Sequence, residues 1–317
     1  MKTKKSILMT VLFVMAVFVL SAPASAEYYA TELVSYSASL TASGLYDDPT
    51  AVLGAPSTNF ANTWGSNPTA RVKLVEPAYN TDLEGNNLIT TLNANQEIVV
   101  GFDHQVENDP NNPYGIDFLV FGNSFYTGNG TVSDDTNMND YLLSGGSTFN
   151  GAGWFEDVLV SVSQGAVEEG MDPNDPDTWD WYTYIDGPYG DNAYPTQAYL
   201  WDAENAEWTD TLSDFTKPVD PDAIDELIGE TGVSAADAIA AYDGSGGGTG
   251  FDLDDLYDLY GVELDWIQYI KVEGTSEFAG GEIDAFTDVA AVPVPAAVWL
   301  LASGLLGLAG LRKRSGC

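Results

Sequence analysis

The sequence predicts a mainly β protein, a jelly-roll-like antiparallel β-sandwich with a short helical insertion. Short segments rich in Val, Ile, Phe and Tyr alternate with clusters of Gly, Asn, Asp and Pro, a pattern typical of strands separated by turns. These segments lie far apart in the chain and are joined by long polar connections, which favours a sandwich with inserted loops over a parallel α/β sheet. The 264 residues from 27 to 290 are enough to bury one large core.

Five segments match the strand pattern closely, and two match it less well. The five cover residues 97–102, 116–122, 157–163, 266–273 and 283–290, and the other two cover 69–75 and 180–185. Two short helices are expected in an insertion at about 220–243. Asp220 before Pro221 is a favourable cap and first-turn pair, and Ser234 with Asp237 resembles a capping box.

Residues 1–26 are expected to be a secretory signal peptide. Three lysines precede an apolar stretch of 14 residues, 7–20, and Ala24 and Ala26 supply the small-x-small cleavage pattern. The alternative is an N-terminal membrane anchor, which the short apolar run and the cleavage pattern disfavour. The mature chain is therefore expected to begin near Glu27.

A second apolar segment, residues 296–311, lies near the C-terminus. As a transmembrane helix, its 16 residues would cover roughly 24 Å, against about 30 Å of membrane hydrocarbon, so its insertion is marginal. The basic residues 312–314 follow it, and the positive-inside rule keeps them in the cytoplasm and the upstream chain outside. An ordinary membrane anchor is one interpretation. Pro293 and Pro295 favour another, because they hold their preceding residues in an extended strip that a protease could bind.

Three features of the tail, residues 291–317, occur together. They are the run Val292-Pro293-Val294-Pro295-Ala296, the apolar helix rich in Leu and Gly, and the basic end Arg312-Lys313-Arg314. In combination they resemble the PEP-CTERM sorting signal in its Val-Pro-x-Pro-Ala variant. Because Val294 stands where the name-giving motif has Glu, the particular exosortase and the position of its cut stay open.

The resemblance implies a route for the protein. After signal peptidase acts, an exosortase, a membrane-embedded transpeptidase of Gram-negative bacteria that make exopolysaccharide, would process the tail. The protein would then be exported across the inner membrane, anchored there transiently, and released or attached at the cell surface or in the extracellular matrix.

The body of the chain resembles a second family. Segments 117–125, 158–163, 267–272 and 281–286 are similar to those of a bacterial cell-surface β-sandwich family that often precedes sorting tails. The similarity is spread over roughly residues 47–289. It implies a jelly-roll-like domain and brings no assigned activity.

Charge limits the partners of the body. The whole chain has a net charge of −38, and between residues 27 and 290 four basic residues face 48 acidic ones, for a net charge of −44. This excludes nucleic acid, which needs a basic surface, and it disfavours anionic lipid. Extracellular Ca²⁺, which prefers carboxylate and carbonyl oxygens, is the expected counter-ion and the one expected cofactor. The single cysteine, Cys317, lies in the tail, so the body is expected to have no disulfide.

Three acidic clusters are candidate calcium sites, and each has an alternative interpretation as solvated surface. The candidate ligands are Asp172, Asn174, Asp175 and Asp177 in a proline-stiffened loop, Asp252, Asp254, Asp255 and Asp258 after the glycine-rich run, and Glu282, Asp284 and Asp288 near the last strand. Strict strand alternation would put the last three on one side of a strand. On a helix, Asp254 and Asp258 would share a face, where repulsion would favour a bound cation.

Aromatic residues gather between positions 179 and 208. Exposed rings beside carboxylates and amides form the kind of surface that sugars bind, and the candidate glycan-binding residues are Trp179, Trp181, Tyr184, Tyr189, Tyr194 and Trp201. The alternative is that these rings pack in the core or in loops.

Enzymatic functions find little support in the sequence. His104 is the only histidine, the body has no cysteine, and neither HExxH nor G-x-S-x-G occurs. The expected function is therefore that of an exported structural protein of the cell surface or matrix, stabilised by calcium. The alternative is a carbohydrate-binding module for exopolysaccharide, and a carboxylate-based glycoside hydrolase is third.

Overall fold

The computed structural model describes residues 28–37, 46–62, 67–79, 81–191, 193–276 and 280–289. The predicted signal peptide, with Ala24 and Ala26, and the whole predicted sorting tail, residues 291–317, lie outside these ranges. Within these ranges, every helix is too short or too polar to cross a membrane.

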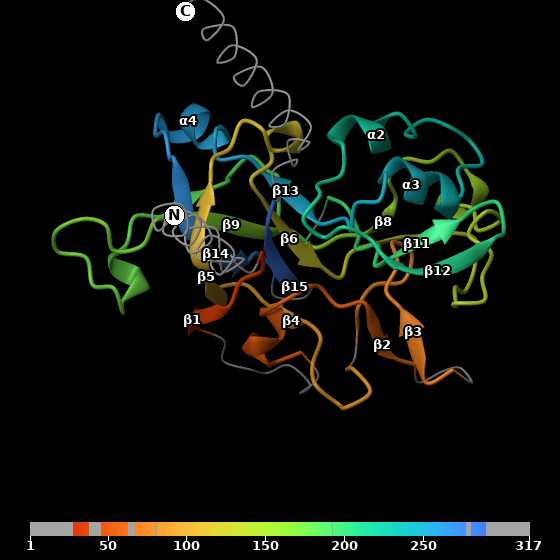
Figure 1. Ribbon diagram of the computed structural model, residues 1–317, viewed down its shortest axis with the longest axis horizontal. Coiled ribbons are helices and arrows are strands. Elements are labelled where there is room, and N and C mark those ends of the chain that lie inside the picture. The colour runs from red at the N-terminus through yellow and green to blue at the C-terminus, as the bar shows by residue number, and fades with distance from the viewer. Residues whose placement is uncertain are drawn as a thin grey trace, which may run out of the picture.

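Two antiparallel sheets form the centre of the molecule (Figure 1). The first sheet has the order β1 (Glu32–Tyr36), β5 (Glu97–Glu107), β14 (Trp266–Gly274), β9 (Val158–Ser163) and β10 (Tyr182–Thr183). The second has the order β13 (Thr249–Phe251), β6 (Phe118–Gly122), β15 (Gly281–Asp288) and β4 (Thr90–Leu92). Strands distant in sequence are neighbours in both sheets, so the chain crosses repeatedly between them.

The main hydrophobic core lies between the two sheets. Val100 of β5, Val160 of β9 and Ile270 of β14 meet Val120 of β6 and Phe286 of β15 there, and all five are buried. Two sheets that bury their facing side chains in this way form a β-sandwich-like fold, as the sequence predicts.

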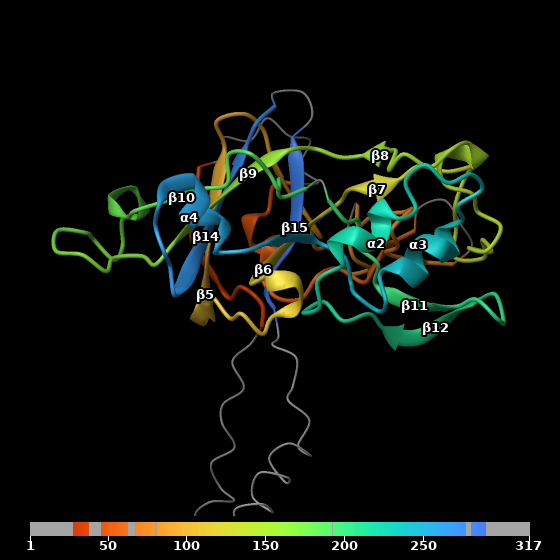
Figure 2. The ribbon, with the colours of Figure 1, turned by 90° about the horizontal axis from the view of Figure 1, so that it is seen from above.

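A second core lies beside the sandwich (Figure 2). It is built around the helices α2 (Pro221–Asp225) and α3 (Ala235–Ala241) and two antiparallel pairs of strands. One pair is β7 (Phe125–Tyr126) with β8 (Gly153–Trp154), and the other is the hairpin of β11 (Tyr199–Asp202) and β12 (Glu207–Leu212). Tyr126, Phe149 and Tyr242 are its largest fully buried side chains. The helical insertion is thus part of a separate apolar cluster.

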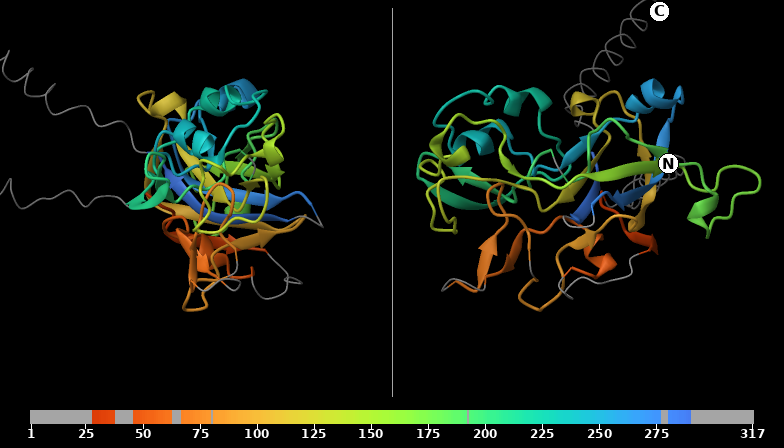
Figure 3. Two further views of the ribbon diagram at one scale, coloured as in Figure 1. Left: turned by 90° about the vertical axis from the view of Figure 1, so that its right-hand side faces the viewer. Right: turned by 180° about the vertical axis from the view of Figure 1, so that it is seen from behind.

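A third cluster covers the outer face of the four-stranded sheet. Leu119 and Phe121 of β6 point away from the main core and pack with Phe60 and Ala70 from the hairpin β2 (Asn59–Ala61) and β3 (Thr69–Arg71). Figure 3 shows this hairpin, in orange, at the edge of the molecule opposite the helices. Consecutive residues of β6 are all buried because both faces of its sheet are covered.

The structure confirms the predicted helices and the five closely matching strands, with differences at the strand ends. Asp220 caps α2, and Ser234 with Asp237 forms the capping box of α3. All five closely matching segments form strands, of which β5 continues to Glu107, and Thr69–Arg71 and Tyr182–Thr183 are strands within the two weaker segments. Helix α4 (Asp255–Tyr260) and several short strands, such as β1 and β4, were not predicted as elements.

Candidate metal centre

Three carboxylates from distant parts of the chain converge at one end of the sandwich. They belong to Glu156, which lies between β8 and β9, to Asp191, in the loop after β10, and to Glu282, the second residue of β15. One ligand oxygen from each lies within 4.8 Å of the other two, and within the described residues this is the one group of three or more acidic, His or Cys side chains so arranged. We call these three residues the acidic triad.

Main-chain contacts fix the position of Asp191. Its Oδ1 accepts the N–H of Ser124 at 3.1 Å, and its Oδ2 accepts the N–H of Glu282 at 3.3 Å. Its own carbonyl accepts the N–H of Glu156 at 3.1 Å, which forms a local antiparallel bridge. The Asp191 side chain is 1% exposed, so it is held rigidly inside the protein.

Two glycines leave the space that the triad occupies. A Cβ at Gly122, the last residue of β6, would lie 2.1 Å from Asp191 Oδ1 and 2.7 Å from the carbonyl oxygen of Glu282. A Cβ at Gly190 would lie 2.8 Å from a methyl group of Val158. Only glycine therefore lets the Asp191 loop approach β6 and β9 this closely.

Glu156 has one satisfied oxygen and one unsatisfied oxygen. Its Oε1 accepts the indole N–H of Trp154 at 3.0 Å, whereas its Oε2 is buried and has no hydrogen-bond donor. The residue is 8% exposed. A buried carboxylate oxygen without a donor is costly, so this atom points to a missing proton or cation.

Electrostatics at the triad favour the same conclusion. Burial, followed by the neighbouring carboxylate of Glu156, raises the pKa of Glu282 well above its ordinary value. Burial also raises the pKa of Asp191 well above its ordinary value. All four basic residues of the body are paired elsewhere, Arg71 and Lys73 with Asp134, Lys217 with Asp243 and Lys271 with Glu273, so none neutralises the triad.

Two species can relieve this negative charge. One is a proton shared between Glu156 and Glu282, which would give Glu156 Oε2 a hydrogen bond. The other is a hard divalent cation, because the donor set consists only of oxygen. Ca²⁺ binds oxygen ligands at about 2.3–2.6 Å, so two ligands on opposite sides of the ion lie about 5 Å apart. The three triad oxygens lie within 4.8 Å of one another, which agrees with this separation.

The proline-stiffened loop 172–178 does not gather its acids around one point. Asp172, Asp175 and Asp177 are exposed. Asp172 Oδ1 accepts the N–H of Asn174, and Asp175 Oδ1 accepts the N–H of Asp177, so two of these side chains cap the turns of their own loop. The side chains of this loop are solvent-exposed, and calcium binding there stays a prediction.

The acids of residues 252–258 lie around the start of α4 and act on one another electrostatically. Asp254 Oδ1 accepts the side-chain N–H of Asn108, Asp258 is exposed on α4, and Asp252 and Asp255 line a pocket described below. Asp254 caps α4 with helical dihedral angles, and the placement of Asp254 and Asp258 on one helix face stays a prediction.

A β-bulge separates the predicted row of Glu282, Asp284 and Asp288. The register of β15 against β6 shifts between Ile283 and Ala285, so strict alternation fails there. Asp284 is buried and accepts hydrogen bonds from the N–H and hydroxyl of Ser57, and Asp288 contacts His104 Nε2 at 2.9 Å. Only Glu282 of these three belongs to the triad.

The predicted glycan-binding aromatics are mostly packing residues. Tyr184 is fully buried and Trp179 is 5% exposed, so neither has a free ring face for a sugar. Trp181 lies beneath the Lys271 ammonium, and Trp201 packs edge to face on Trp208. Tyr189 is half-buried, and Tyr194 is the one member of the set that lines the pocket next to Asp252.

Sequence reasoning missed Glu156 and Asp191 as candidate ligands. Neither lies in an acidic cluster, and 35 residues separate them in the chain. The Gly190-Asp191 pair is not a specific signal, since a glycine also precedes Glu230 and Glu282. Comparison of the chain with protein-family models gives no match, and comparison with curated proteins gives none either.

Proposed function

We propose that the protein is an exported structural protein of the cell surface or extracellular matrix, and that a calcium ion at the acidic triad stabilises its fold. The observation that carries the calcium part is the buried Glu156 Oε2, which has no donor and lies beside two further carboxylates. The N-terminal signal pattern and the exosortase-type tail support export across the inner membrane and sorting to the surface.

A structural role agrees with where the triad lies. The three residues join the loop after β10, the connection from β8 to β9, and β15, which is the last described strand. A cation there would cross-link these segments in a body that contains no cysteine. The order of strands in the two sheets further supports the proposal that the sandwich is jelly-roll-like.

Calcium titration of the full-length chain, purified in neutral detergent, tests this function. At 100 times the dissociation constant, a ligand that binds only the folded state stabilises it by about 2.7 kcal/mol. For a chain of this size, that corresponds to a rise in melting temperature of roughly 5–10 °C. With extracellular affinities of about 10⁻⁴ to 10⁻³ M, 100 times the dissociation constant corresponds to about 10–100 mM Ca²⁺. A smaller rise should already develop at a few millimolar Ca²⁺. An unchanged melting temperature and no heat of binding would refute the calcium site.

A second candidate function is carbohydrate binding. The specific observation in its favour is a pocket lined by Tyr194, three prolines and two carboxylates, which combines apolar rings with polar acceptors. This pocket shares no residue with the acidic triad, so the two functions can be tested separately.

A further inference from the structure

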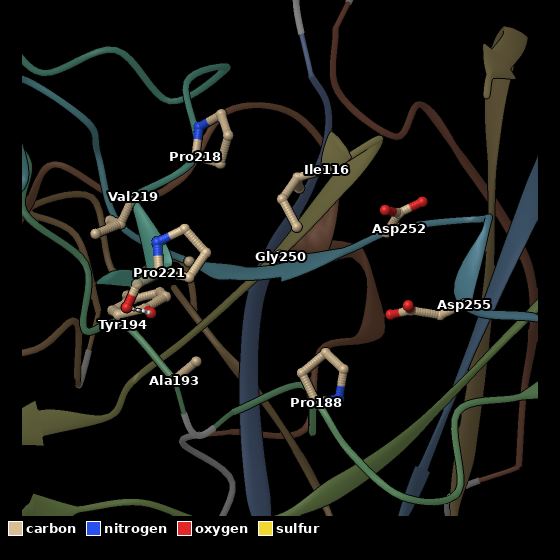
Figure 4. Close-up of a pocket in the computed structure, with 11 residues that line it drawn as sticks. Ile116, Pro188, Ala193, Tyr194, Pro218, Val219, Pro221, Gly250, Asp252 and Asp255 are labelled. Carbon is tan, nitrogen blue, oxygen red and sulfur yellow. Dashed lines mark hydrogen bonds between the residues drawn. The ribbon is translucent and has the colours of Figure 1, made fainter. Parts of the chain in front are cut away.

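A cavity of about 250 Å³ lies between the sandwich and the second core. Figure 4 shows Pro218, Val219, Pro221 and Tyr194 on one side of it and Asp252 with Asp255 on the other. Ile116 and Gly250 lie between the two sides. The volume is slightly below that of drug-sized sites, about 300–1,000 Å³, so the cavity suits one small ring rather than a long chain.

The apolar wall of this cavity is rigid. Pro188, Pro218 and Pro221 restrict the backbone around it, and the Tyr194 hydroxyl donates to the Pro221 carbonyl at 3.4 Å. The Tyr194 ring also packs edge to face on the buried Tyr242. A wall with few rotatable groups needs little ordering when a ligand binds.

The opposite side of the cavity has two carboxylates with unused hydrogen-bonding capacity. Asp252 Oδ1 accepts the N–H of Asp254. Asp252 Oδ2 lies next to Gly115, where an added Cβ would come within 2.7 Å of that oxygen. Within the described residues, the Asp255 carboxylate has neither a hydrogen bond nor an ion pair, and the cavity lining includes no basic side chain. Burial and the neighbouring acids raise the pKa of both groups.

This arrangement selects a ligand with an apolar face and a positive charge. A neutral sugar would offer the apolar C–H face and the hydroxyls, but it would leave the two carboxylates without a counter-charge. A simple alkylamine would offer the charge, but it has no hydroxyls for the remaining carboxylate oxygens. A 2-amino-2-deoxyhexose has all three features in one ring.

We propose that this pocket binds an amino-sugar unit of a cationic polysaccharide, with the ring on Tyr194 and the prolines and the ammonium between Asp252 and Asp255. The proposal rests on the second candidate function and gives it a substrate class. The strong negative charge of the exported body would attract a polycation over a longer range and raise the rate of association.

Calorimetric titration with the β-1,4-linked glucosamine dimer tests the proposal, with its di-N-acetyl form as the matched neutral ligand. At roughly pH 6.5 the amines are mostly protonated, and we expect the free-amine dimer to bind at one site at least about tenfold more tightly than the acetylated dimer. Asp252→Asn and Asp255→Asn should each lower the affinity for the free-amine dimer by about tenfold or more and leave the affinity for the acetylated dimer unchanged.

Asp258→Asn is the matched control, because Asp258 is exposed like Asp255 and lies on the same helix, but outside the cavity lining. This substitution should change the affinity for the free-amine dimer by less than about twofold. Equal affinity for both dimers, or an equal effect of the Asp258 and Asp255 variants, would overturn the proposal. If Ca²⁺ displaces the sugar, and only the Asp252 and Asp255 variants lose Ca²⁺ binding, the pair would instead be a metal site. Thermal melting of each variant verifies that it is folded. Failure of the amino-sugar proposal would leave the calcium proposal at the triad unaffected.

Discussion

The main-chain N–H of Glu282 donates to Asp191 Oδ2 at 3.3 Å, and the side chain of the same Glu282 places a carboxylate oxygen within 4.8 Å of Asp191. One residue of β15 therefore both stabilises the buried aspartate and adds a second negative charge beside it. The hydrogen bond is part of the folded backbone and cannot be lost without moving the strand. The charge is what a cation or a proton must neutralise.

Replacing Glu156 with glutamine should separate the calcium response from the fold. Glu156→Gln removes one charge of the triad and introduces an N–H₂ group that can donate to Glu282, so the calcium-free protein should gain about 1–2 kcal/mol. The rise in melting temperature with Ca²⁺ should disappear. Differential scanning calorimetry with and without millimolar Ca²⁺ measures both effects.

Glu168→Gln is the control for that experiment, because Glu168 is exposed in the loop after β9. It should change the melting temperature little and keep the full calcium response. A Glu156→Gln protein that still responds to Ca²⁺ like the original would mean that the cation binds elsewhere.

The pH dependence of stability should differ between the calcium-free and calcium-bound protein. Burial beside Glu156 raises the pKa of Glu282 from 4.5 to about 10. Over this interval the folded state holds more protons than the unfolded state, so stability is greatest at the acidic end and falls as the pH rises. With Ca²⁺ bound, Glu282 is already ionised and this loss should be absent.

In the window from about pH 8 to 9, the triad should contribute more to the slope of stability against pH than the other buried carboxylates do. Burial raises the pKa of Asp117 and Asp288 to about 6 and that of Asp284 to about 7, so these groups also reduce stability as the pH rises, but only at lower pH. Chemical denaturation at several pH values, with EDTA or with Ca²⁺, gives the two slopes. A calcium-free stability that is flat between pH 8 and 9 would contradict the raised pKa of Glu282.

The sequence predicted most of the sandwich because its central strands have distinct local patterns. The run Ile98-Val99-Val100 in β5 consists of β-branched residues, which favour a strand, and the caps at Asp220 and Ser234 predict the starts of α2 and α3. Strands of two or three residues, such as β7, have no such pattern. They form because residues distant in the sequence pack against them, and a short stretch of sequence does not reveal these contacts.

The acidic triad could not be predicted because density of acids in the sequence is a poor guide to proximity in the fold. The dense cluster at Asp172 and Asp175 caps its own turns in solvent, whereas Glu156 and Asp191, 35 positions apart in the chain, meet through a β-bridge. A row on β15 was expected from strict alternation, but the bulge between Ile283 and Ala285 directs the intervening aspartate toward Ser57. Side-chain direction after a bulge depends on the partner strand, which the sequence does not specify.

Gly122→Ala should destabilise the fold and the calcium site together. The added Cβ would come within 2.1 Å of Asp191 Oδ1 and 2.7 Å of the Glu282 carbonyl oxygen, so the Asp191 loop must move. We expect a loss of about 1–3 kcal/mol and a weaker response to Ca²⁺, measured by thermal melting with and without the ion. Gly101→Ala is a useful comparison, since its closest contact would be with the ring of Tyr269, at 3.0 Å. It should leave the calcium response intact.

The buried Lys73 ammonium should contribute far more to stability than the exposed Lys217 ammonium. Lys73 is fully buried, and its Nζ donates to the Arg71 carbonyl at 2.9 Å, to Asp134 at 3.1 Å and to Glu76, which uses all three of its N–H groups. Lys73→Met removes the cation and leaves two poorly solvated carboxylates, for an expected loss of about 3–5 kcal/mol. Lys217→Met breaks a pair with the exposed Asp243 carboxylate and should cost about 1 kcal/mol or less. Urea denaturation of the two variants measures the difference directly, and similar losses for both would show that burial does not determine the worth of these ion pairs.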